Sequence, residues 1–191
     1  NSSNSNDIPK LFKDMNLEPG NYVWGVGSNA DMDIQGERVK LDNEVAMSLE
    51  RPPYNKLCLE HDASGKNTGG IASFGIIKYS RIVPEMDNQH IILAKANDQH
   101  HLFPSVWGSI QNRNIDSFSI AGFADKEQRY NPETGRNEVV RLVKQLKETS
   151  LTGMPANAGA GIIGTFIKKS YADHDFFSPA KAPGGIELFK K

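Results

Sequence analysis

The chain has 191 residues, a length typical of one domain. Apolar residues make up 38% of it and charged residues 24%, a balance that excludes an intrinsically disordered chain. The 22 basic and 23 acidic side chains nearly cancel, so we expect no nucleic-acid partner. No apolar run approaches the ~20 residues of a membrane span, so no membrane partner is expected either.

The chain begins with a polar run of Asn, Ser and Asp and without Met. Such a run cannot bury apolar surface, and we interpret residues 1–7 as a linker or tail. Residues 8–191 are then a single catalytic or effector domain, which we expect to be excised from a larger delivery polypeptide.

The first two thirds of the chain mix short helices with many strands. Apolar spacing predicts a short amphipathic helix over residues 8–15, a strand over 22–28 that enters a glycine loop, and a second helix over 43–50. Short β-rich runs then follow one another between turn clusters, at 56–60, 71–83, 90–96, 101–107 and 114–123. Such close spacing favours antiparallel pairing, because parallel strands need long crossovers.

The last third predicts a helix over 137–149, with Val139, Val140, Val143 and Leu146 on one face. Residues 158–171 have helical apolar spacing but three glycines, so they fit a helix or a strand. Residues 186–189 are typical of a closing strand. Together these elements predict an α+β domain with a strand-rich antiparallel core of the split β-sandwich type and three to four helices.

One candidate site is a set of Cys, His and Asp side chains. Cys58 is the single thiol, so an internal disulfide and a cysteine-rich metal site are excluded. His101 opens the predicted strand 101–107, and Asp116 lies on the next one, so a hairpin would let the carboxylate orient the imidazole toward a thiolate. The order resembles that of papain-like effector proteases and glutamine deamidases. A buried structural role for Cys58 stays open.

A metal centre is not expected. His61, His90, His100 and His101 have no partner at the spacing of a metal-binding motif. The Asp-x-Asp pair of Asp173 and Asp175 lacks a phosphate-binding loop, so we interpret it as a solvated turn.

The order of three further elements resembles that of the ADP-ribosyltransferase toxins. An early strand, Tyr22-Val23-Trp24-Gly25-Val26-Gly27-Ser28, carries aromatic residues and ends at a glycine turn. A central strand carries Ser117-Phe118-Ser119, and Glu187 follows the glycine pair Gly184-Gly185. Trp24 stands where that family has arginine, and Gly185 stands where many members have Glu or Gln.

The resemblance implies a mono-ADP-ribosyltransferase that transfers ADP-ribose from NAD to a side chain of a host protein. Glu187 would stabilise the oxocarbenium-like transition state. Ser119 would position the active-site strand and Arg81 would bind a phosphate, while Tyr22, Trp24 and Gly25 would hold the nicotinamide. In that family such a domain is secreted or injected and acts in the host cytoplasm, as in the C-terminal effectors of insecticidal Tc-type toxins.

A non-catalytic binding module is the remaining alternative. Trp24, Trp107 and Tyr130 would then mark an interface, because Trp and Tyr are effective anchors of protein contacts. The same three residues could equally be ordinary core residues.

Overall fold

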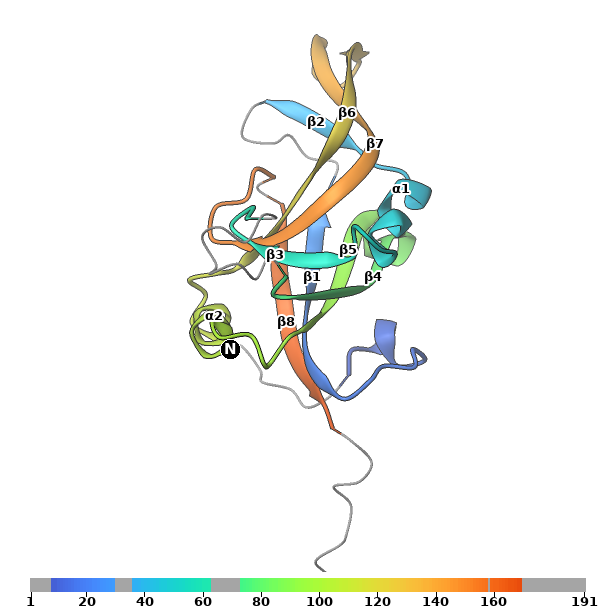
Figure 1. Cartoon of the computed structure of the whole chain (residues 1–191). Helices are drawn as coiled ribbons and strands as arrows, with labels where there is room; N and C mark the ends of the chain where they lie inside the picture. The colour runs from blue at the N-terminus through green and yellow to red at the C-terminus, as the bar shows by residue number, and fades with distance from the viewer. Residues whose placement is uncertain (1–7, 30–35, 63–72, 158, 170–191) are drawn as a thin grey trace, which may run out of the picture.

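The computed structural model describes residues 8–29, 36–62, 73–157 and 159–169. Eight strands are found in these ranges (Figure 1): β1 (Gly20–Ser28), β2 (Glu37–Lys40), β3 (Lys56–Leu59), β4 (Gly75–Val83), β5 (Gln89–Ala96), β6 (Ser117–Asn131), β7 (Arg136–Thr152) and β8 (Gly161–Lys168). The strand-rich α+β class expected from the sequence is confirmed.

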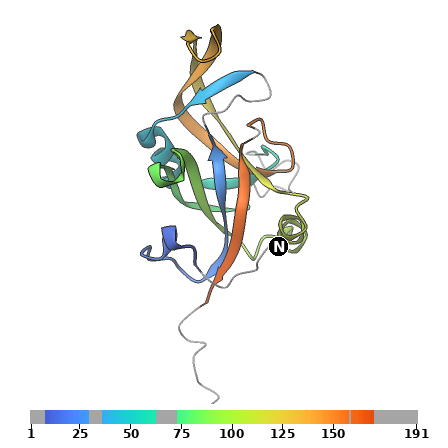
Figure 2. The same ribbon diagram turned by 180° about the vertical axis from the view of Figure 1, so that it is seen from behind.

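The described strands form one mixed sheet in the order β2-β7-β3-β4-β5-β1-β8, with β6 paired to β7. Most pairs are antiparallel, as expected, but β7 runs parallel to both β2 and β3. The sheet curls, so that β8 passes close to the start of β6 (Figures 1 and 2). There the amide of Ile162 donates a hydrogen bond to the carbonyl of Asp116, at 2.6 Å. The described strands thus form one curled sheet, and the described part of the chain has two α-helices where three to four helices were expected.

Both faces of β1 and β5 are buried, which explains their nearly continuous apolar sequences. Val23 and Ile92 lie in one core cluster, while their chain neighbours Tyr22 and Ile91 lie in a second cluster on the opposite face. The first cluster includes side chains of β3, β6, β7 and α2. The second includes Phe12 and residues of β4 and β8.

Two α-helices and three single 3₁₀ turns are described: α1 (Asn43–Met47), α2 (Phe103–Gln111), η1 (Lys10–Phe12), η2 (Ser48–Glu50) and η3 (Pro84–Met86). The helix predicted over 43–50 is present as α1 followed by η2, and Asp42 caps it through the amide of Val45, at 2.8 Å. The helix predicted over 8–15 shortens to the single turn η1.

The strand predicted over 101–107 is wrong, because residues 103–111 form α2. Val106 and Ile110 are buried one turn apart, and the rings of Phe103 and Trp107 stack at 5.4 Å on the same helix. This i, i+4 pattern extends past the end of the strand that was predicted. No helix in the described part of the chain is long and apolar enough to cross a membrane.

The helix predicted over 137–149 is also wrong, because these residues lie in β7. Two register shifts against β6 leave Lys144 and Lys147 without a partner in the ladder, and both are exposed. Each such bulge moves the alternation of buried and exposed side chains by one position. The resulting three-residue spacing imitates the period of a helix.

Candidate active site

Hydroxyl side chains gather on the face of β6 and β7 that points away from the main core. Ser119 pairs with Ser150 across these strands, and side chains at paired positions lie on the same face of a sheet. Their paired neighbours Phe118 and Leu151 belong to the core cluster on the other face. Strand alternation therefore places Ser119 and Ser150 together outside that cluster.

The turn that follows β3 brings His61 over this face. Glu60 and His61 both have left-handed backbone conformations, with φ of 48° and 59°, which non-glycine residues adopt rarely. The turn is held to β7, because the amide of Glu60 donates to the carbonyl of Leu151 at 3.0 Å and the amide of His61 donates to Ser150 Oγ at 3.1 Å. The Glu60 carboxylate also accepts from Thr152 Oγ1, at 2.8 Å. These contacts offset the cost of the unusual backbone.

His61 connects Ser119 to Glu148 through both nitrogens of its ring. Its Nε2 lies 2.8 Å from Ser119 Oγ, and its Nδ1 lies 3.1 Å from Glu148 Oε1. An ionised carboxylate can only accept hydrogen bonds, so Nδ1 carries the proton and donates it to Glu148. Nε2 is then a free acceptor, and Ser119 donates its hydroxyl proton to it. Ser150 Oγ donates to the same Glu148 oxygen at 2.7 Å and fixes the carboxylate.

The three side chains differ in their exposure to solvent. Ser119 is almost fully buried, whereas 44% of the His61 side chain is exposed. Glu148 is largely covered, so its interaction with the imidazole is screened less than that of a surface ion pair.

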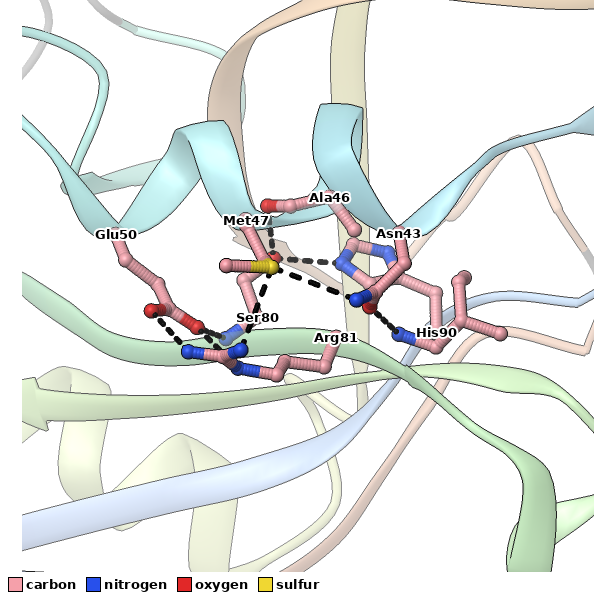
Figure 3. A network of polar contacts seen from close by, with 8 residues as sticks. Asn43, Ala46, Met47, Glu50, Ser80, Arg81 and His90 are labelled. Carbon is pink, nitrogen blue, oxygen red and sulfur yellow. Dashed lines mark hydrogen bonds and ion pairs between the residues drawn. The ribbon is translucent and has the colours of Figure 1, made fainter.

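In a second Ser–His pair the hydrogen bond runs in the opposite direction, from the imidazole to the serine (Figure 3). Ser80 Oγ donates to the carbonyl of Ala46 at 2.7 Å, so the contact of 2.8 Å between Ser80 Oγ and His90 Nε2 must have the imidazole as donor. His90 Nδ1 is buried and has no hydrogen-bond partner. This imidazole cannot accept the Ser80 proton, so the pair is a structural contact.

Arg81 lies in the same network, beside the edge of β4 (Figure 3). It forms a bidentate ion pair with Glu50, whose Oε2 is 2.9 Å from Arg81 Nη2. The side chains of Glu50 and Asn43 accept hydrogen bonds from the backbone amides of Ser80 and Ile82, respectively. The short strand β3 does not extend far enough along β4 to pair with these two residues. These side chains satisfy backbone donors that an open strand edge would leave free. Arg81 makes no described contact with Ser119.

The residues predicted to hold nicotinamide lie in β1. Tyr22 is fully buried, its ring stacks on Phe166 at 5.0 Å, and its hydroxyl donates to the carbonyl of Glu18. Trp24 is partly buried and packs edge-on against Phe12, at 5.4 Å. A Cβ at Gly25 would meet the backbone of β8. These contacts give all three residues a packing role.

Cys58, His101 and Asp116 share no described contact, and the hairpin on which their grouping depended is not formed. His101 is exposed in the turn before α2, where its ring stacks on His100, while Asp116 accepts a hydrogen bond from Ser117 Oγ. Burial, together with the charge of Glu148, raises the pKa of the Cys58 thiol to about 11. A thiol with so high a pKa is protonated at neutral pH and is a poor nucleophile.

Several sequence predictions fall outside the described residues. Glu187, the linker 1–7, the closing strand 186–189 and the Asp173/Asp175 pair all lie there. Within the described ranges, no group of three or more His, Cys, Asp and Glu side chains is arranged to hold a metal ion. Compared with protein-family models, with curated proteins and with solved structures, the chain has no significant match to any of the three.

From the sequence, Ser119 was expected only to position a strand, as the resemblance implied, and neither His61 nor Glu148 was predicted to be its partner. His61 and Ser119 are 58 residues apart, and His61 and Glu148 are 87 apart, so no local motif joins them. Glu148 lies within the helix that was predicted over 137–149, and this prediction hid its alternation with Ser150. A correct assignment of strands to residues 117–121 and 148–152 would have brought Ser119, Glu148 and Ser150 together.

Proposed function

We propose that this protein catalyses acyl transfer or ester hydrolysis, with Ser119 as nucleophile, His61 as general base and Glu148 as the residue that orients the imidazole. The observation that carries the proposal is the continuous relay from Ser119 Oγ through His61 to Glu148, with contacts of 2.8 and 3.1 Å. A serine hydroxyl is a weak nucleophile until a base removes its proton, and this arrangement supplies that base.

The proposed reaction has two halves. Ser119 Oγ attacks the carbonyl carbon of an ester while His61 Nε2 takes the hydroxyl proton, and the Glu148 carboxylate stabilises the imidazolium. The carbonyl re-forms as the ester C–O bond breaks, and Nε2 returns the proton to the leaving alkoxide. Water then gives its proton to Nε2 and attacks the acyl-Ser119 ester, which releases the acid and restores the Ser119 hydroxyl.

The direction of the hydrogen bonds supports a chemical role over a merely structural one. The imidazole of His61 accepts from its serine, is partly open to solvent and contacts a carboxylate. The imidazole of His90 donates to its serine, is fully buried and contacts no carboxylate within the described residues. The unusual φ of His61 places it among the residues where backbone strain accompanies function.

Hydrolysis of p-nitrophenyl acetate and butyrate by purified protein tests the proposal. We expect kcat/KM to fall about a thousandfold or more in Ser119→Ala and His61→Gln, because members of such a relay act as a unit. Glu148→Gln should also lose activity, because the carboxylate that orients the imidazole is removed. Ser117→Ala is the matched control, because Ser117 lies on the same face of β6 but bonds Asp116, and its activity should match the wild type.

Two outcomes would overturn the proposal: turnover that is equal in wild type and Ser119→Ala, or no turnover above buffer by folded wild-type protein. The ADP-ribosyl transfer predicted from the sequence stays a prediction, because its Glu187 lies outside the described residues. Incubation with labelled NAD and a cell lysate tests it separately. Transfer of label that Glu187→Gln abolishes and Ser119→Ala retains would favour that function over ester hydrolysis.

A further inference from the structure

A cavity of ≈ 510 Å³ opens where the chain enters β1, β4 begins and β5 ends. Its walls include Glu18, Pro19, Ile76, Lys78, Lys95 and Asn97. The volume lies within the range of small-molecule sites in proteins. None of the residues of the Ser119 relay lines it, so it is a separate feature of the molecule.

The cavity has an apolar wall that the fold does not cover. Ile76 pairs with Lys95 across β4 and β5, and 46% of Ile76 is exposed although the side chain is a large aliphatic one. Pro19 and Ala96 extend this wall. An aliphatic surface inside a concavity gains free energy when a flat apolar molecule covers it.

Two lysines line the cavity together with the carboxylates of Glu18 and Asp98, so the cavity has a net positive charge only when the Glu18 side chain has turned away. Lys95 Nζ lies 2.9 Å from Glu18 Oε2, and Lys78 Nζ lies 3.5 Å from Glu18 Oε1. The stem of Lys95 passes over Gly20, where an added Cβ would meet it. The lysines are 27% and 29% exposed, whereas Glu18 is 62% exposed, so the carboxylate lies on the solvent side of the cation pair.

We propose that this cavity binds a small organic anion, with one carboxylate, sulfonate or phosphate on an apolar body. The anionic group of the ligand takes the place of the Glu18 carboxylate against Lys78 and Lys95, and the apolar body lies on Ile76. Glu18 thus competes with the ligand for the two lysines. Its exposed side chain rotates into solvent at a small cost, because surface ion pairs contribute little.

A matched pair of fluorescent probes tests this inference on the intact chain. One probe is 8-anilinonaphthalene-1-sulfonate, and the other is N-phenyl-1-naphthylamine, which has the same aromatic body without the sulfonate. We expect the wild type to bind the sulfonate more tightly. Lys78→Met and Lys95→Met should each lower the affinity for the sulfonate probe about three- to fivefold, which is the scale of a partly exposed charge contact. Neither variant should change the affinity for the neutral probe.

Three further variants make the result specific. Glu18→Gln should tighten sulfonate binding about threefold, because it removes the competing charge. Ile76→Ser should lower the affinity for both probes. Lys126→Met is the control, because Lys126 forms a Lys–Glu pair with Glu37, at 2.7 Å, and neither residue lines the cavity. Failure of the wild type to bind the sulfonate, equal affinity in the Lys95 and Lys126 variants, or weaker binding in Glu18→Gln would each overturn the inference.

Discussion

Acid should destabilise this protein through one buried imidazole, that of His90. Burial lowers the pKa of His90 to about 3, against an ordinary value of 6.5. The ring already donates from Nε2 to Ser80 (Figure 3), and Nδ1 is buried without a hydrogen-bond partner. A second proton on Nδ1 would therefore leave a buried positive charge without a partner, which is strongly unfavourable.

The size of the effect follows from proton linkage. The pKa of His90 is lower in the folded protein than in the unfolded chain, so the unfolded chain binds this proton first as the pH falls. The contribution of His90 to stability is therefore fully present above about pH 6.5 and is lost as the pH falls toward 3. Between about pH 7 and about pH 5, the contribution of His90 to the free energy of unfolding falls by about 2 kcal/mol.

Urea denaturation of the wild type and of His90→Gln at both pH values measures this contribution. Glutamine has a similar volume, keeps a donor for Ser80 and cannot be protonated. Every other titrating group is common to the two proteins, so the wild type should lose about 2 kcal/mol more than the variant between the two pH values. Equal losses in the two proteins would refute the assignment of His90 as a neutral, buried imidazole.

Three shorter predictions test the packing of other elements. Gly122→Ala should destabilise the protein by about 1–3 kcal/mol, because the new methyl group would meet the backbone carbonyl of Gln145. Gly108→Ala should stabilise it by about 0.5–1 kcal/mol, because this position in α2 has open space around it and alanine favours a helix; thermal melts that rank the two variants otherwise would contradict both expectations. Cys58 should react with a thiol reagent such as DTNB far more slowly in the native protein than in urea at neutral pH, because burial raises its pKa; equal rates would show that the thiol is not buried.

The sequence predicted the strand-rich class and most elements, because local signals there agree with tertiary packing. The helix predicted over 43–50 is found as α1 and η2, and the strands predicted over 22–28 and 90–96 are found in β1 and β5. The helix predicted over 137–149 was wrong because bulges change the alternation at Lys144 and Lys147 in β7. Register shifts depend on the partner strand, so one strand's sequence does not reveal them.

The candidate site was only partly predictable for the same reason. Ser119 was named from the sequence only because Ser117-Phe118-Ser119 entered the resemblance to the ADP-ribosyltransferases, and there it was expected to position a strand. Its base lies in a left-handed turn after β3, and its carboxylate lies in a strand whose pairing with β6 depends on contacts far apart in sequence. Only the parallel pairing of β3 with β7 brings His61 and Glu148 together, and no local pattern specifies that pairing.

Covalent labelling with a fluorophosphonate tests the central claim most directly, because an activated serine displaces fluoride from phosphorus and keeps the adduct. Peptide mass spectrometry of the labelled wild type should place the phosphonate on Ser119, with at least about a hundredfold slower labelling in His61→Gln. Labelling of Ser117 or Ser150 at the same rate as Ser119, or labelling of Ser119 that is equally fast in His61→Gln, would contradict the account.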